Sequence, residues 1–372
     1  MAGNRRPTYY VVAVIFIVAF VARFILGYTP VFEYALGATN SPDVTKIGVY
    51  DDFYGIYLIW INLLGRGLIP YVNGAFPLLH YPPLFLYSLY LGYLAGGVIG
   101  AGMIITVSDC ASAVMIYLIA KELSSDANVA KLTGLAYALL PLALLTEGIS
   151  LLSLEPMTFF ILLSIYFLHK NRLLYSAILL AVAVCFRQEA LFLLIVYLPM
   201  LYEKPSSMLL PAAAFLLIVA LVSAPFLAIN AQQYISEVLY SHNPTYPTSG
   251  QLYISSTVLL SPLYILCPAV LIALAMLLNA KRLAERKYEY LGAVGVVVLV
   301  MLYGMMGYEI LNYYMLPAYA LLLASCTKSH SIAAVFIVST ISIFAAPGWQ
   351  QEIMPLVALL ALAMITERAR NK

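Results

Sequence analysis

The sequence predicts an all-α polytopic membrane protein. Of its 372 residues, 63% are hydrophobic and only 10% are charged, whereas an average soluble domain carries about 25% charged residues. The mean hydropathy is +0.94. A span needs roughly 20 apolar residues, so the length allows about 11–13 transmembrane helices and leaves no room for a soluble domain. We therefore expect 1–372 to be a single transmembrane domain.

The first helix is expected at Tyr9 to Gly27, directly after Arg5 and Arg6. Its 19 residues exceed the apolar core of a typical signal peptide, and no small-residue cleavage site follows it. We expect this segment to remain in the membrane as the first span.

Lysines and arginines predict the orientation, because cytoplasmic loops are enriched in them. The clusters that mark inside loops are Arg5 and Arg6, Lys121 and Lys131, Lys170 and Arg172, Lys204, 281–287, Lys328 and 368–372. The segments left outside are 28–83, 147–155, 187–189, 230–256, 308–314 and 348–352. Both termini are then cytoplasmic, and the polar clusters of interest share the extracytoplasmic side.

One stretch conflicts with this scheme. The segments 84–97 and 101–120 each resemble a helix, and two crossings there would place Lys121 outside. Either the first segment is short and does not cross, or part of 53–69 crosses as well.

Composition excludes some function classes. The net charge is +2 and the basic residues are scattered, without the stripe that follows a nucleic-acid backbone. The four cysteines lie in apolar segments without CxxC spacing, which argues against a disulfide framework or a zinc site.

The candidate reactive centre lies in the long outer loop, 28–83. Asp43 precedes the adjacent pair Asp51 and Asp52. Two neighbouring carboxylates repel each other, so one pKa rises in a partly desolvated site unless a cation compensates. Such a group is suited to act as a general base, although a single loop carboxylate is commonly just solvated. The segment from Phe53 to Leu64 is expected to be an amphipathic interfacial helix, with Trp60 at the headgroup level.

The end of this loop reads Leu79-His80-Tyr81-Pro82-Pro83-Leu84. Its prolines force an extended entry into the next helix. His80 is either a hydrogen-bonded interface residue or a phosphate or metal contact beside the carboxylates.

A second polar cluster, Arg187-Gln188-Glu189, interrupts two apolar stretches. An arginine inside a span needs a partner because its insertion costs roughly 2.5–3.5 kcal/mol. That partner is either Glu189 with nearby aromatic and carbonyl groups, or the phosphate of a lipid carrier, which the planar guanidinium fits well.

Asp109 lies well inside a predicted helix. An ionisable residue there is either functional or paired. We favour a pair with Arg23 or Arg187.

Together these motifs resemble the GT-C glycosyltransferases, and in style the GPI mannosyltransferase and the dolichyl-phosphate-mannose-dependent mannosyltransferases. The resemblance covers about residues 1–205, leaving 206–372 as variable C-terminal helices. The motifs that carry it are Asp51-Asp52, Tyr81-Pro82-Pro83-Leu84, Arg187-Gln188 leading to Leu198-Pro199, and a weaker 312–317. It implies a GT-C-like bundle with a large first extracytoplasmic loop.

The resemblance also implies an activity. Such enzymes transfer a sugar, here a hexose with mannose favoured, from a polyprenyl or dolichyl phosphate to a lipid, glycan or protein acceptor, with inversion. By this resemblance Asp51 or Asp52 is the base, and Arg187, His80 and Tyr81 hold the donor phosphate. The supporting polar residues are Asp43, Asp109, Glu155, Gln188 and Glu189.

The chain departs from the family at two motifs. The GPI branch has Asp-x-Asp where this chain has adjacent aspartates, and other branches have Lys before Pro-Pro where this chain has Tyr81. The branch and its need for a divalent cation, Mg or Mn, with Asp51, Asp52 and His80 as ligands, therefore stay open. So do a secondary transporter using Asp109 with Arg187, and a catalytically silent lipid-binding subunit.

Overall fold

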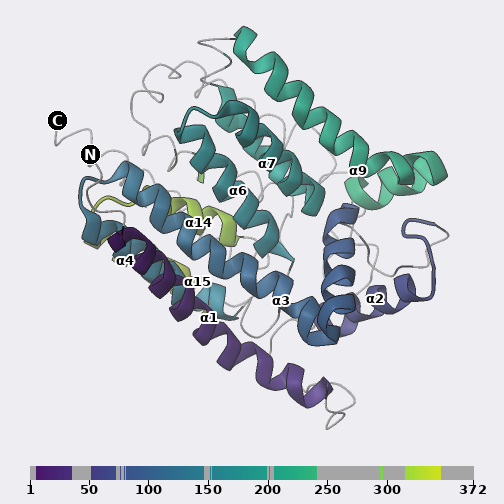
Figure 1. Ribbon diagram of the computed structural model, residues 1–372, viewed down its shortest axis with the longest axis horizontal. Coiled ribbons are helices and arrows are strands. Elements are labelled where there is room, and N and C mark those ends of the chain that lie inside the picture. Colours follow the sequence, from purple (N-terminus) through teal and green to yellow (C-terminus); the bar gives the residue numbers. More distant parts are fainter. Residues whose placement is uncertain are drawn as a thin grey trace.

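The computed structural model describes residues 6–35, 52–72, 76, 79, 81–145, 151, 153–198, 201, 205–240, 291, 294–295 and 315–344. All regular structure among these residues is helical (Figure 1). The prediction of an all-α protein is confirmed.

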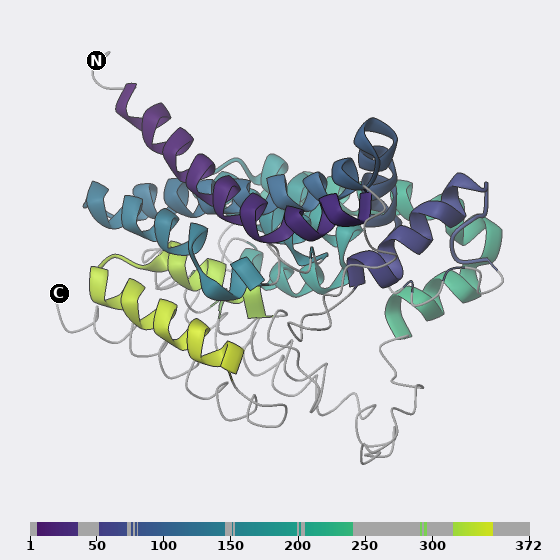
Figure 2. The same cartoon turned by 90° about the horizontal axis from the view of Figure 1, so that it is seen from below.

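Five long helices lie side by side across the view of Figure 1, in the spatial order α9, α7, α6, α3 and α1. Their bounds are Arg6–Ala35 for α1, Pro83–Leu123 for α3, Leu154–His169 for α6, Leu173–Phe186 for α7 and Leu209–Ile235 for α9. The helix α4, Ala127–Ala138, packs against α1 and α3. Figure 2 shows α14, Leu316–Ser325, and α15, Ser329–Phe344, on the face opposite α1.

Shorter elements connect these helices. They are η2, Phe53–Tyr57; α2, Leu58–Gly65; α5, Pro141–Ala143; η4, Gln188–Tyr197; η5, Pro205–Met208; and η6, Ser236–Tyr240. The helix expected over 53–64 is therefore present as η2 followed directly by α2. Trp60, however, is fully buried against the Tyr57 ring, at a centroid distance of 5.1 Å. Its indole therefore packs among aromatic side chains of the protein, and its expected position at the headgroup level remains a prediction.

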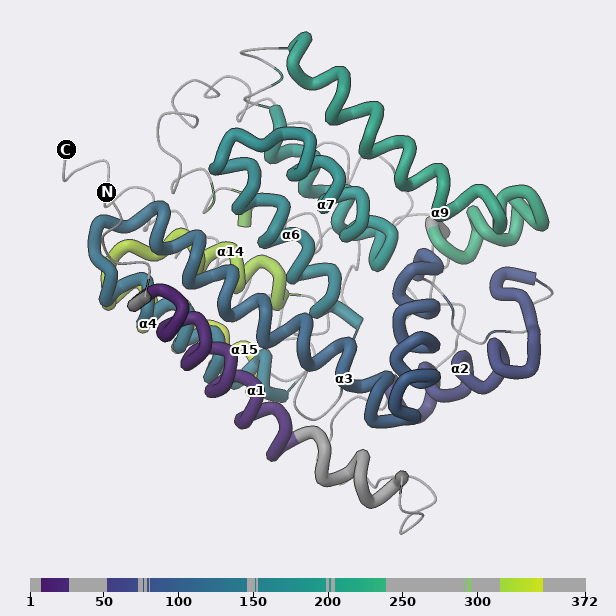
Figure 3. Tube along the Cα trace, viewed as in Figure 1, coloured from purple at the N-terminus to yellow at the C-terminus, as the bar shows by residue number. Residues whose placement is uncertain are grey.

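The helix α3 contains a sharp bend, which Figure 3 shows clearly. Gly97 has φ +61°, a conformation that glycine adopts without steric cost. Gly92 and Gly100 then meet across the bend, where a Cβ on Gly92 would lie 2.5 Å from the Gly100 carbonyl oxygen. The segment before the bend runs at a steep angle to the rest of α3 (Figures 1 and 3). This geometry agrees with the alternative in which the stretch 84–97 is not a separate crossing.

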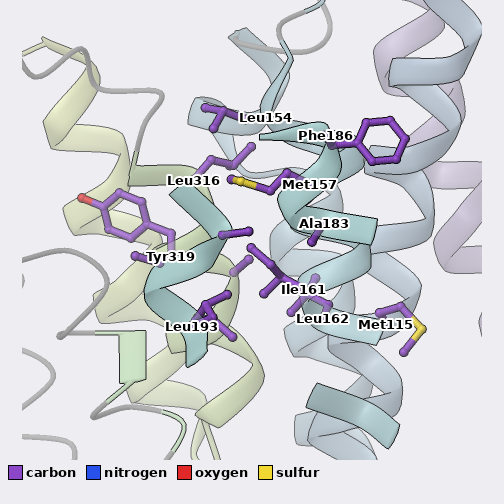
Figure 4. Close-up of a cluster of buried hydrophobic side chains, with 14 of the residues drawn as sticks. Met115, Leu154, Met157, Ile161, Leu162, Ala183, Phe186, Leu193, Leu316 and Tyr319 are labelled. Carbon is purple, nitrogen blue, oxygen red and sulfur yellow. The ribbon is translucent and has the colours of Figure 1, made fainter. Parts of the chain in front are cut away.

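The packed core lies where α3, α6, α7, η4 and α14 meet, as Figure 4 shows. The side chains drawn there include Met115, Leu154, Met157, Ile161, Leu162, Ala183, Phe186, Leu193, Leu316 and Tyr319, all of them buried. In lipid, close packing and polar contacts stabilise such a bundle more than burial of apolar area does.

Three helices among the described residues are long and apolar enough to cross a membrane, at Thr8–Leu26, Pro83–Leu123 and Pro205–Val238. Shorter apolar helices accompany them. The chain is an integral membrane protein.

Basic clusters from separate loops meet at one end of the bundle. Lys121 Nζ donates to Thr8 Oγ1 at 2.8 Å, and Lys170 Nζ pairs with Glu122 Oε2 at 2.6 Å. The start of α1, the end of α3 and the α6–α7 connection therefore lie together. Because α7 runs from this end to Phe186, Arg187 lies toward the opposite end.

Candidate functional site

The candidate site forms where four segments meet: the first-loop helix η2–α2, the entry to α3, the start of α6, and the break between α7 and η4. At that break the backbone of Arg187 is extended, with φ −152° and ψ 129°. The extended residue ends α7 and starts η4 in a new direction. Its side chain is thereby directed into the interior, where it is fully buried.

The Arg187 guanidinium makes three kinds of contact. Its Nη2 donates to Glu189 Oε1 at 2.6 Å and its Nε donates to Oε2 at 3.3 Å. Its Nη1 donates to Ser153 Oγ at 2.5 Å, directly before α6. The Tyr81 ring lies under the guanidinium, with 4.4 Å between Cζ and the ring centroid. Glu189 and an aromatic ring, one of the two kinds of partner predicted for Arg187, are thus present.

Tyr81 is fixed by its position before two prolines. The residue before a proline is restricted to extended conformations, and Pro83 then starts α3. The Tyr81 ring makes edge contacts with Trp60, at 5.9 Å between centroids, and with Phe85, at 5.8 Å. The first-loop helix and the entry to α3 thereby hold this ring beside Arg187.

Tyr57 lies at the centre of the cluster and is buried. Burial raises the pKa of Tyr57 well above its ordinary value, and the neighbouring Tyr81 and Asp52 raise it further. Ser153 and Arg187 act in the opposite direction. The phenol therefore stays neutral and lies within electrostatic reach of a carboxylate and a guanidinium.

Asp52 is half-buried and directly precedes η2. The short helix joins it to the buried Tyr57, whose pKa responds to the charges of Asp52 and Arg187. Asp43, Asp51 and His80 lie outside the described residues, and their proposed roles remain predictions.

Two of the supporting polar residues of the prediction, Gln188 and Glu189, lie next to Arg187. Glu189 pairs with it, and Gln188 is buried beside it in the first turn of η4. Glu155 is fully buried in the first turn of α6, two residues after Ser153. No group of three or more His, Cys, Asp or Glu suited to a metal ion occurs in the part of the chain that the structure describes.

Asp109 belongs to a different buried cluster. It forms an ion pair with Arg23 Nε and accepts a hydrogen bond from Tyr137 Oη at 2.8 Å. Arg23 Nη1 also donates to the Ala138 carbonyl oxygen at 2.7 Å. The prediction that Asp109 is paired is confirmed, and its partner is Arg23.

Two residues of the candidate site, Tyr57 and Ser153, were not predicted from the sequence. Tyr54, Tyr57 and Trp60 follow one another at intervals of three, which places them near one face of a helix. That spacing could have identified Tyr57. Ser153 carried no comparable signal, because its role depends on the approach of α7 to α6.

The bundle and its first-loop helix define the class of protein. The fold is similar to that of the crystal structure of ArnT from Cupriavidus metallidurans bound to undecaprenyl phosphate, with a TM-score of 0.54. The match covers 96% of this chain and 75% of that chain at 13% sequence identity. The chain therefore has the GT-C fold, as predicted.

The sequence narrows this class to a family. The model for the GPI transamidase subunit PIG-U matches residues 60–249. The chain belongs to the PIG-U family. None of the curated proteins compared with the chain matches it.

Proposed function

We propose that the chain is an inverting glycosyltransferase that moves a hexose, with mannose favoured, from a polyprenyl or dolichyl phosphate to a lipid, glycan or protein acceptor. The observation that supports it most is the stacking of the buried Arg187 guanidinium on the Tyr81 ring, which also contacts Trp60 of the first-loop helix that Asp52 directly precedes. The ArnT structure with the same fold contains undecaprenyl phosphate, which supports a lipid phosphate as the partner here. The reaction would occur on the extracytoplasmic face.

Asp52, or its neighbour Asp51, would act as the general base. The acceptor hydroxyl oxygen attacks the anomeric carbon from the face opposite the phosphate, and its proton passes to the carboxylate. A bond forms between that oxygen and the anomeric carbon while the bond from this carbon to the phosphate oxygen breaks. The polyprenyl phosphate leaves with the bonding electrons, so the configuration inverts. A positioned carboxylate typically contributes a factor of about 10²–10⁴ to the rate.

The charge of the leaving phosphate needs compensation. Arg187 is the cation of the described cluster, but Glu189 already neutralises much of its charge. A phosphate would therefore share the guanidinium with Glu189 or displace that carboxylate. His80 is proposed as a further phosphate contact. A divalent cation would suit the carboxylates of Asp51 and Asp52, since Mg²⁺ and Mn²⁺ prefer oxygen ligands, and it would stabilise the phosphate charge.

A second candidate function has its own support. The matched family model describes a subunit of GPI transamidase, and the Arg187–Glu189 pair is complete without any ligand. On this alternative the chain is a catalytically silent, lipid-binding subunit of a membrane complex. The site would then hold a lipid headgroup, and the carboxylate of Asp52 would carry out no chemistry.

The decisive experiment measures transfer from polyprenyl-phosphate hexoses by the purified protein. We expect Asp51→Asn or Asp52→Asn to reduce the rate by about 10²-fold or more while binding of the carrier persists. Asp126→Asn is the matched control. Asp126 caps α4, its Oδ1 accepting from the Asn128 backbone amide at 2.8 Å, and asparagine caps equally well.

The same assay separates the two candidates. EDTA should abolish transfer, and Mn²⁺ should restore it, if a cation takes part. Carrier binding without transfer across the donor panel, unchanged by either aspartate variant, would instead support the silent subunit.

A further inference from the structure

The loop that carries Tyr81 is connected to a distant helix through Tyr71. This residue lies between α2 and Tyr81, and only 3% of it is exposed. Its hydroxyl donates a hydrogen bond to the backbone carbonyl oxygen of Tyr81. The carbonyl precedes two prolines that lack amide hydrogens, and a buried carbonyl without a donor is costly. The phenol of Tyr71 therefore links the part of the loop that follows α2 to the part that precedes α3.

The backbone of Tyr71 is in the left-handed region, with φ +59°. A bulky residue rarely adopts this conformation, and it persists only where the surroundings enforce it. Such a strained residue is often found near a functional site. Here the ring of the residue with this backbone conformation lies against α9.

The ring of Tyr71 lies in a socket formed by the second half of α9. Its centroid is 4.9 Å from that of Tyr234 and 5.2 Å from that of Phe226, both in edge geometry. The two socket rings stack on each other at 5.8 Å. Figures 1 and 2 show the α2 loop beside this end of α9.

A hydrogen bond connects the two parts of α9 on either side of a break in this helix. The backbone of Asn230 is non-helical, with φ −155° and ψ 81°. Ser223 Oγ and Tyr234 Oη, on the two sides of the break, are 2.9 Å apart in a hydrogen bond. This hydrogen bond links Tyr234 to the first part of α9, and the Tyr71 ring packs against both Phe226 and Tyr234.

We propose that Tyr71 is a positioning residue that holds Tyr81 against the Arg187 guanidinium and so shapes the donor-phosphate site. The contacts form one path from α9 through the Tyr71 ring, its hydroxyl and the Tyr81 backbone to the Tyr81 ring over Arg187. That this site recognises the carrier phosphate rests on the proposed function. The positioning of Tyr81 does not.

The test removes one oxygen atom with Tyr71→Phe, which keeps the ring in its socket. We expect the KM for the polyprenyl-phosphate donor to rise about tenfold, because a buried carbonyl loses its donor and the ring shifts. The rate kcat should fall, and the KM for the acceptor should stay unchanged. A merely unstable protein would lose active fraction without a selective change in the donor KM.

Tyr87→Phe is the matched control. Its ring also contacts Phe226, at 6.2 Å between centroids, and the same atom is removed from a half-exposed side chain. We expect both KM values to stay at the wild-type level. Should Tyr71→Phe fail to fold, Phe226→Leu weakens the socket without altering the loop and should raise the donor KM by a smaller factor.

A second measurement is independent of turnover. The chain has two tryptophans, so Trp349→Phe leaves Trp60 as the single tryptophan, whose emission can be excited selectively over that of tyrosine. Its ring centroid is 5.9 Å from that of Tyr81. Tyr71→Phe in this background should increase quenching of Trp60 by acrylamide. If the unaltered protein transfers no sugar, the proposed function fails while this measurement still tests the position of Tyr81. Quenching and donor KM both identical to those of Tyr87→Phe would overturn the inference.

Discussion

Two arginines among the residues that the structure describes are fully buried, and their surroundings differ. Arg23 on α1 pairs with Asp109 on α3 and also donates to the Ala138 carbonyl at the end of α4. Its partners are 86 and 115 residues away in the sequence. Arg187 pairs with Glu189, only two residues away, and gains Ser153 and Tyr81 from other segments.

The difference indicates what each charge does. Every contact of the Arg23 pair comes from the packed interior of α1, α3 and α4, so it fastens helices together. Arg187 lies at a helix break, and its acidic partner belongs to the same short segment. Such a pair can rearrange without separating two long helices. We therefore interpret Arg23 as structural and Arg187 as the charge available to a ligand.

The largest effect of a substitution is expected at Arg23. Arg23→Ala leaves the Asp109 carboxylate buried without its cation, and we expect a loss of about 3–5 kcal/mol in the free energy of unfolding. Denaturant titration of the purified protein in detergent measures it. The double variant Arg23→Met with Asp109→Leu should recover most of the loss, since no charge stays buried. If Arg23→Ala lowered the free energy of unfolding by less than about 1 kcal/mol, the pair would not stabilise the packing of α1 against α3.

A smaller effect on stability is expected for Arg187→Lys. Lysine keeps the charge but loses the bidentate fork and the flat stack on Tyr81. We expect the free energy of unfolding to fall by about 1–2 kcal/mol. The affinity for the carrier should fall by a greater fraction than the free energy of unfolding does. Titration with polyprenyl phosphate measures the carrier affinity, and denaturant titration in detergent measures the free energy of unfolding. Equal carrier affinity in Arg187→Lys and the unaltered protein would argue against the ligand role.

The smallest effect is expected at the opposite end of the bundle. Lys170 and Glu122 are both 39% exposed, and an exposed pair contributes about 0–1 kcal/mol. Their hydrogen bond raises the pKa of Lys170. This contribution is therefore present at neutral pH and is lost as the pH rises through the raised pKa. Glu122→Gln should change the unfolding free energy by less than about 0.5 kcal/mol, and a larger change would show that this end is packed more tightly than its exposure indicates.

The class of protein and some partners of the buried charges could be predicted from the sequence, for identifiable reasons. The apolar runs specify membrane helices directly, because a span is a local requirement on about 20 consecutive residues. Arg187 and Asp109 were conspicuous for the same reason, since a charge in an apolar run needs a partner. The choice between Arg23 and Arg187 as the partner of Asp109 stayed open, because it depends on which helices are neighbours.

Other features depended on the packing of distant segments. Trp60 looked like an interfacial anchor, but its burial follows from rings of Tyr57 and Tyr81 that close over it. The bend at Gly97 could be suspected from adjacent glycines, yet its direction comes from the contact between Gly92 and Gly100. Tyr71 gave no signal at all, since its socket lies on α9, more than a hundred residues along the chain.

The amino-acid sequence alone predicts an all-α membrane protein with an acidic first loop, a proline-bounded entry to the next helix and a charge at Arg187 that needs a partner. Hydrophobicity, proline geometry and the cost of burying a charge act within a few residues, so their effects can be predicted from short stretches of sequence. Only the tertiary structure decided that Arg23 fastens α1 to α3, that Tyr81 lies under Arg187, and that Tyr71 links this contact to α9. Those pairings are set by which helices pack together, and packing in lipid depends on the shapes of whole surfaces.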